Sequence, residues 1–250
     1  NGNPINLRAG QTVTVELEYT NDSTEAEDFS AKTVTVVITG TASGVNSAQV
    51  INTVADDVYS EGSESYTLSV KNISTNVSGL GTIKAHETNG VKDSVTGTIT
   101  DDVDTVKVEL TATTATSEDG GQIVYTATLT NVDGLPVTAK ESVTVTLENG
   151  ETIIIPAGET TADSTPVLVN RDDVYKENDS IVNKIKEISG GASFENLEAD
   201  KTPVTTIIED DKDIVTATIS GDTSVNEGSA ASYKVELLDE NDQPVIAKED

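Results

Sequence analysis

The chain has 250 residues, long enough for about two compact domains with a hydrophobic core in each. Its 44 acidic and 15 basic residues give a formal net charge of -29, which argues against nucleic acid or an anionic membrane surface as a partner. The absence of cysteine excludes disulfide bonds and thiol chemistry. No apolar run approaches the roughly 20 residues of a membrane span, so no direct membrane insertion is predicted. The first residues lack a signal-peptide pattern, and the chain reads as a fragment.

In chain order, hydrophobic residues recur with a period of two. Val13, Val15 and Leu17 alternate with polar residues, as half-buried strands do. The same alternation recurs in residues 66–70, 106–110, 123–129, 143–147, 215–219 and 233–237. Residues 181–188 fit either a helical stripe or a strand, and the context favours a strand. Many short strands separated by Gly, Asn and Asp turns predict an all-β fold of tandem Ig-like, Calx-β-like sandwiches in an extended array.

The chain is internally repetitive. The motif Asp-Asp-Val-Tyr occurs at residues 56–59 and 172–175, and acidic stretches begin at Asp101 and Asp210, 109 residues apart. A turn containing glutamate precedes a strand at residues 116–121 and again at 224–229. These repeats predict two sandwich domains, at 1–104 and 105–213, and the N-terminal part of a third at 214–250.

The register of the first repeat has two solutions. Either Gly10 corresponds to the turn at Gly120, or residues 2–5 correspond to residues 134–137 and the opening strands are missing. The second is favoured, because residues 243–245 end the third repeat at about the same point. The two ends are then complementary halves of one domain, and head-to-tail pairing of these incomplete units is an expected interaction. The other expected partners are neighbouring repeats of the same chain.

The acidic stretches between strands indicate a cation. Each stretch joins two β-patterned runs without Gly or Pro, and crowded carboxylates repel one another unless a bound ion reverses that effect. A solvated acidic loop is the alternative. The recurrence of three acidic elements in the same order favours Ca²⁺, which takes six to eight oxygen ligands, over Mg²⁺, which prefers water.

These motifs resemble a known family. The Asp-Asp-Val-Tyr-x-Glu motif, the acidic exit and the loop at residues 21–29, with Phe29 where the family has Tyr, resemble the Calx-β and Ig-like repeats of giant RTX-type bacterial adhesins. Residues 189–195 and 202–206 resemble a second repeat type of such adhesins. The resemblance implies a calcium-stiffened extender of a type I-secreted, extracellular adhesin at the bacterial cell surface, acting in cell adhesion and biofilm formation.

The resemblance also implies a set of candidate Ca²⁺ ligands. In the first repeat these are Asp28, Asp56, Asp57, Glu61, Asp101, Asp102 and Asp104. In the second repeat they are Glu118, Asp172, Asp173, Glu177, Asp210, Asp211 and Asp213. Glu227 is the candidate of the third repeat.

Two other functions compete with this prediction. One repeat could bind a glycan or a protein through its loops, as a ligand-binding adhesin module. A glycosidase would need two positioned carboxylates in an aromatic cleft, and only two Phe and six Tyr are present. His86 is the single histidine and lies in a polar stretch, so no Ser or Cys triad can be named. The chain is therefore predicted not to be an enzyme.

Overall fold

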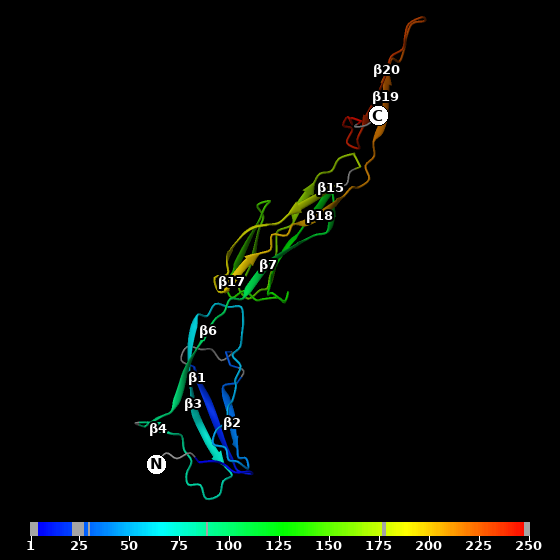
Figure 1. The fold of residues 1–250 in the computed structure, drawn as a ribbon. Helices are drawn as coiled ribbons and strands as arrows, with labels where there is room; N and C mark the ends of the chain where they lie inside the picture. Colours follow the sequence, from blue (N-terminus) through cyan, green and yellow to red (C-terminus); the bar gives the residue numbers. More distant parts are fainter. Residues whose placement is uncertain (1–4, 22–27, 30, 89, 177–178, 248–250) are drawn as a thin grey trace. The chain divides into compact units, whose positions relative to one another are not determined.

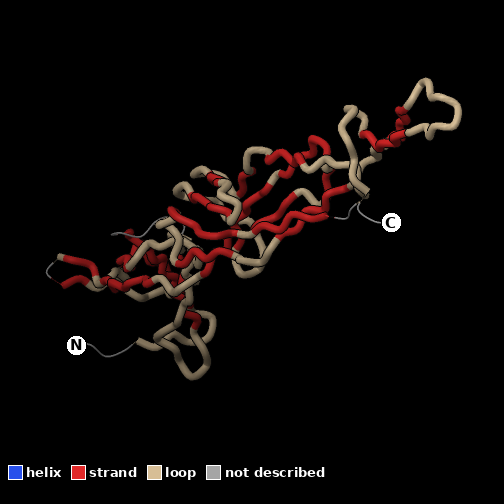
Figure 2. Tube along the Cα trace, turned by 90° about the horizontal axis from the view of Figure 1, so that it is seen from above, coloured by secondary structure: helices blue, strands red, loops and turns tan. Residues whose placement is uncertain are grey.

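The computed structural model describes residues 5–21, 28–29, 31–88, 90–176 and 179–247. All regular elements in these ranges are β-strands, joined by loops and turns (Figure 2). The predicted all-β fold is therefore confirmed. In the described part of the chain, no helix has the length and apolar character to cross a membrane. The chain forms two compact units: unit 1 comprises residues 1–104 and 193–196, and unit 2 comprises residues 105–192 and 197–250.

Unit 1 is built on one four-stranded antiparallel sheet with the order β2-β1-β3-β6 (Figure 1). Its strands are β1 (Thr12–Asn21), β2 (Thr33–Thr39), β3 (Ser63–Thr75), β6 (Ser94–Thr100) and the small hairpin β4 (Glu87–Thr88) and β5 (Val91–Lys92). The period-two alternation predicted for residues 13–17 and 66–70 lies on β1 and β3. These two strands pair along most of their length, with a β-bulge between Glu16 and Leu17.

An aromatic cluster occupies one end of unit 1. Tyr19 stacks on Phe29 with ring centroids 4.1 Å apart, and the ring of Tyr66 meets both edge-on. Tyr66 also lies opposite Gly97 on the neighbouring strand, where a side chain would collide with the ring. The large rings therefore fill space that the small residue leaves free.

Unit 2 contains several small sheets. Its strands are β7 (Thr105–Ala112), β8 (Ala115–Ser117), β9 (Asp119–Ile123), β10 (Tyr125–Thr130), β11 (Val143–Leu147), β12 (Thr152–Ile155), β13 (Thr161–Asp163), β14 (Val167–Asn170), β15 (Asp179–Asn183), β16 (Ile185–Gly190), β17 (Asn196–Ala199), β18 (Val204–Glu209), β19 (Thr216–Gly221) and β20 (Tyr233–Leu238). The sheet orders are β13-β10-β7-β17, β12-β11-β16, β15-β18-β8, β14-β9 and β19-β20. Residues 181–188 are strands, as the context predicted.

The core of unit 2 follows from the alternation of buried and more exposed residues along its strands. The inward residues of β7, β10, β11 and β12 are buried, and the residues between them are more exposed, so each strand places one apolar face inside. The fully buried side chains include Val106, Val108, Ile123, Tyr125, Leu129, Val143, Val145, Leu147, Ile153, Ile155 and Ile185. This core holds the strand ends, and with them the acidic loops, in place.

β1 in unit 1 and β11 in unit 2 occupy the same place in their units. β1 lies between β2 and β3, as β11 lies between β12 and β16, and both strands carry a bulge before a leucine, Leu17 or Leu147. The opening of unit 1 therefore matches the middle of unit 2. In the described part of unit 1, no strand takes the place of β7 or β10.

Candidate metal centres

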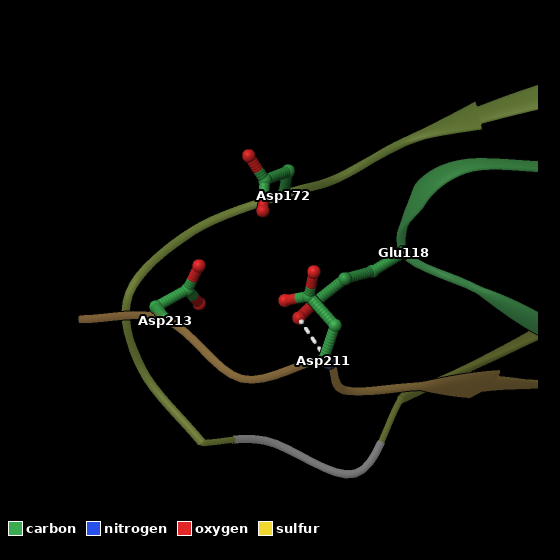
Figure 3. Close-up of side chains that lie close together, drawn as sticks. All are labelled: Glu118, Asp172, Asp211 and Asp213. Atoms are coloured by element: carbon green, nitrogen blue, oxygen red, sulfur yellow. Dashed lines mark hydrogen bonds between the residues drawn. The ribbon is translucent and has the colours of Figure 1, made fainter. Parts of the chain in front are cut away.

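One acidic group in unit 2 consists of Glu118, Asp172, Asp211 and Asp213, here called the Glu118 cluster. One carboxylate oxygen of each residue lies within 4.8 Å of the others. Figure 3 shows the four side chains pointing toward one another from three separate segments. Glu118 is buried in the turn between β8 and β9, Asp172 follows β14, and Asp211 and Asp213 follow β18.

Strand pairing brings these segments together. β8 runs parallel to β18, so that Ser117 lies beside Glu209, and β14 pairs with β9, so that Asn170 lies beside Asp119. Each of these pairs stops within two residues of a cluster member. Because the ladders fix where the strands end, they also fix where the carboxylates meet.

Backbone hydrogen bonds hold the turn at Glu118. Its N–H donates to the carbonyl of Glu209, and its own carbonyl accepts from the N–H of Arg171. Its Oε1 accepts a 3.2 Å hydrogen bond from the N–H of Asp211. Glu118 is thus bonded to the segments that carry the other members of the cluster.

Among the described residues, no basic side chain contributes to the pKa shifts of Glu118, Asp172 and Asp213. The N–H of Asp211 lowers the pKa of Glu118, but burial and the charges of Asp210, Asp211 and Asp173 together raise that pKa above its ordinary value. Burial raises the pKa of Asp172, and nearby carboxylates raise it further. Burial and nearby carboxylates, Asp211 first among them, also raise the pKa of Asp213. The site therefore favours the binding of positive charge.

The spacing of the cluster fits Ca²⁺. This ion binds oxygen at about 2.3–2.6 Å, so oxygens on opposite sides of it lie at most about 4.6–5.2 Å apart. The carboxylate oxygens of the Glu118 cluster lie within 4.8 Å of one another, so one such ion could contact all four residues. Four carboxylates with additional backbone or water oxygens match the ligand set that Ca²⁺ prefers.

Unit 1 contains a matching group formed by Asp56, Asp102 and Asp104, here called the Asp56 cluster. These residues also have carboxylate oxygens within 4.8 Å of one another. The charges of Asp102 and Asp104, followed by burial, raise the pKa of Asp56. By position in the repeat, the three residues correspond to Asp172, Asp211 and Asp213, so both units gather the same acids.

A second group in unit 1 consists of Asp28, Glu61 and Glu64, here called the Glu64 cluster, with the same 4.8 Å limit. Asp28 and Glu64 are buried, and Glu61 is exposed. The sequence reasoning missed Glu64, although a signal was present. Glu64 lies two residues before Tyr66 and four before Leu68. Alternate residues of a strand share a face, so a carboxylate lies on the apolar side of β3.

The members of the two unit 1 groups, with the exception of Asp104, line one hollow of about 260 Å³. Eight of its lining residues are carboxylates and none is basic: Asp28, Asp56, Asp57, Glu61, Glu64, Asp101, Asp102 and Glu195. Glu195 was also missed by the sequence reasoning. Its Oε2 accepts from the N–H of Asp104, while burial and the charges of the exit acids raise its pKa. It is distant in sequence from the other residues of this hollow, and no local pattern predicts its position.

The remaining predicted ligands that the structure describes lie outside the three clusters. Asp57 and Asp173 each accept a 2.7 Å hydrogen bond from the backbone N–H two residues on, at Tyr59 and Tyr175. These two acids therefore shape the same turn in both units.

Asp101 has a comparable structural role. Its Oδ2 accepts from the N–H groups of Glu61 and Gly62. Asp210 lies beside the Glu118 cluster and contributes to its negative charge. Glu227 is exposed in the loop between β19 and β20, and Glu177 lies outside the described residues.

Comparison with known proteins adds a family match. Residues 104–211 match the family model described as LapA domain. This stretch is similar to a domain of a large adhesin family. The similarity indicates a role in cell adhesion and a location at the cell surface or outside the cell.

Among solved structures, the chain is similar to one described as the calcium binding domain CBD12 of CALX1.1. The sequence identity is 14% and the TM-score is 0.33, and the match covers 79% of this chain and 87% of that chain. The comparison with curated proteins gave no match.

Proposed function

We propose that this chain is a calcium-stiffened extender of a bacterial cell-surface adhesin. The observation that carries the proposal is the repetition of one acidic arrangement in both units. The Asp56 cluster and the Glu118 cluster each join the first Asp of the Asp-Asp motif to the acids of the exit segment, defined as residues 101–104 in unit 1 and 210–213 in unit 2.

Ca²⁺ would act on these exit segments. Without an ion, the crowded carboxylates repel one another. This repulsion is the main cause of the raised pKa of Asp56, and it adds to burial in raising the pKa of Asp213. A bound divalent cation changes this repulsion to attraction and holds the exit segment against its own unit. The chain then leaves each unit in a defined direction, and a string of such units projects instead of collapsing.

The proposal extends to the kind of adhesin. The motifs resemble RTX-type adhesins that reach the cell exterior by type I secretion and act in biofilm formation. In this role the repeats hold ligand-binding domains away from the cell and perform no chemistry of their own. The match of residues 104–211 to an adhesin domain supports this proposal.

Small-angle scattering of the full chain tests the stiffening role. At concentrations where the chain is monomeric, we expect a larger maximum dimension in Ca²⁺ than in chelator. The double variant Asp102→Asn, Asp211→Asn removes one acid from each exit segment and is expected to give the chelator dimensions in both buffers. Asp133→Asn changes an exposed turn outside the clusters and is expected to behave as the wild type. Equal wild-type dimensions in the two buffers would refute the role.

A further inference from the structure

Residues 193–196, here called the strap, are part of unit 1, although the residues on both sides of them in the sequence belong to unit 2. Gly190 and Gly191 come shortly before the strap and have φ angles of 85° and 65°. Glycine adopts such angles at little cost, so the chain can turn where β16 ends. The strap is therefore a short segment of unit 1 that begins after a glycine turn.

Main-chain hydrogen bonds hold the strap against residues 58–60. The N–H of Ser60 donates to the carbonyl of Ser193 over 2.9 Å, and the N–H of Glu195 donates to the carbonyl of Val58 over 3.2 Å. These two bonds form a short antiparallel bridge. The strap thus adds a strand-like segment to the loop that carries the Asp-Asp-Val-Tyr motif of unit 1.

The ring of Phe194 anchors the strap. It stacks on the ring of Tyr59, with ring centroids 5.6 Å apart and an angle of 18° between the ring planes. Phe194 is only 5% exposed, and Tyr59 lines the unit 1 hollow of about 260 Å³, here called the acid hollow. Burial of an aromatic ring stabilises more than one net hydrogen bond does. Loss of the Phe194 ring is therefore expected to open the strap.

The strap also brings a carboxylate to the acid hollow. Glu195 lines this hollow, and its Oε2 accepts a hydrogen bond from the N–H of Asp104. Burial raises the pKa of Glu195, and the charges of the exit segment raise it further. Closure of the strap therefore adds one negative charge to a hollow already lined by carboxylates. A divalent cation in the hollow would turn this cost into an attraction.

We propose that the strap closes on the acid hollow of unit 1 with Phe194 as its anchor, and that a cation in the hollow stabilises the closed strap through the charge of Glu195. The second part rests on the proposed calcium function. Coupling of this kind is reciprocal, so a closed strap must increase the affinity for the cation by the same factor. Phe194 then strengthens cation binding although its side chain offers no ligand atom.

Thiol alkylation at Ser193 measures whether the strap is closed. The Oγ of Ser193 is buried and has no hydrogen-bond partner among the described residues, so Ser193→Cys loses no hydrogen bond. The chain has no other thiol. In Ca²⁺ we expect Ser193→Cys to react with iodoacetamide at least about fivefold more slowly than in chelator. Ala192→Cys, at an exposed position just before the strap, should react fast in both buffers. Equal rates for the two variants in both buffers would overturn the proposal.

Phe194→Ala tests the anchor and the reciprocity. Added to Ser193→Cys, it is expected to raise the alkylation rate in both buffers. Alone, it is expected to weaken Ca²⁺ binding to unit 1 by about fivefold or more, although no ligand is removed. Calorimetry measures this affinity in an Asp211→Asn background, which weakens the Glu118 cluster and so assigns the heat to unit 1. Tyr233→Ala removes an aromatic ring that is 64% exposed and is the control. An unchanged affinity would overturn the link between the strap and the cation.

Glu195→Gln isolates the charge, because glutamine keeps an oxygen that can accept the hydrogen bond from Asp104. In chelator we expect this variant to slow the alkylation of Ser193→Cys, since repulsion is relieved. We expect Ca²⁺ to change the rate less than it does with Glu195 present. Glu187→Gln, at an exposed position on β16, is the matched control. A full response to Ca²⁺ without the charge of Glu195 would contradict its assigned role.

Two outcomes separate this proposal from the proposed function. If calorimetry detects no Ca²⁺ binding to the wild type, the proposed function fails, while slow alkylation of Ser193→Cys that Phe194→Ala relieves still supports the closed strap. If Ca²⁺ binds but leaves the alkylation of Ser193→Cys unchanged, the proposed function stands and the coupling of the strap to the cation is overturned.

Discussion

The backbone N–H of Asp211 donates a hydrogen bond to Oε1 of Glu118, 93 positions earlier in the chain. This bond ties the segment after β18 to the turn that follows β8. It also places a buried glutamate among three aspartates, in a group of carboxylates that could hold a metal ion.

Glu118→Gln keeps an oxygen that can accept this hydrogen bond and removes the charge. We expect Ca²⁺ affinity at the Glu118 cluster to fall by about tenfold or more, because one anionic ligand is lost. In chelator we expect no loss of thermal stability, since the variant also relieves repulsion. Calorimetric titration and thermal unfolding measure the two effects, with Asp133→Asn as the control. An unchanged affinity would exclude Glu118 as a ligand.

The pH dependence of stability should reveal the crowding at Asp56. Its pKa is raised in the folded chain, mainly by Asp102 and Asp104, so the folded state holds this proton more tightly than the unfolded state does. The contribution of Asp56 to the free energy of unfolding therefore falls as the pH rises from its ordinary pKa of 3.8 through the higher folded value, and it stays low above that.

Asp179 and Asp200 have lowered pKa values and act in the opposite direction, so the contribution of Asp56 must be isolated by difference. In chelator, we expect Asp56→Asn to gain stability relative to wild type as the pH rises through this window. In Ca²⁺ the sign should reverse, because the wild type binds the ion better once Asp56 is ionised. Denaturant unfolding at several pH values measures both. A difference that does not vary with pH in chelator would contradict the assigned repulsion.

Gly97 should be intolerant of a side chain. A Cβ at this position would lie 2.5 Å from the ring of Tyr66, in a cluster that also contains Tyr19 and Phe29. We expect Gly97→Ala to destabilise unit 1 by about 1–3 kcal/mol, the usual cost of overpacking. Gly81→Ala is the matched control, because a Cβ there has no neighbour within 4 Å. Tyrosine fluorescence during unfolding follows the change, and equal effects of the two variants would count against this packing.

Truncation of Leu129 tests the packing of the core of unit 2. Its side chain is fully buried on β10, so Leu129→Ala should lower the free energy of unfolding by about 2–5 kcal/mol. Val132, only three residues later, is 70% exposed, and Val132→Ala is expected to change stability by less than about 0.5 kcal/mol. Chemical denaturation compares the two. A small effect at Leu129 would mean that β10 does not pack in the core of unit 2 as described.

Most of the fold follows from local alternation. The period of two in residues 106–110 and 143–147 reports directly which side chains face inward, and β7 and β11 bury those residues. The ambiguity at residues 181–188 was settled by neighbouring strands, because a short apolar run does not distinguish a helix from a strand by itself.

The acidic groups could be predicted only in part. Asp172, Asp211 and Asp213 belong to motifs that recur, so their convergence in a sandwich could be expected. The same motifs include Asp57 and Asp101, which bind backbone N–H groups instead, and sequence spacing does not separate these roles. Contacts such as that of Glu195 with Asp104 depend on long-range packing that no local pattern encodes.

The parallel pairing of β8 with β18 has a mechanical consequence. When a chain is pulled from residues 105 and 213, β8 and β18 are drawn in opposite directions along their common axis. Their hydrogen bonds are then loaded in shear and must break together, whereas an antiparallel hairpin pulled at its open end unzips one bond at a time. The Glu118 cluster lies just beyond this pair and links the same two strand ends. A metal ion bound there would hold the ends of β8 and β18 together and oppose their separation under tension.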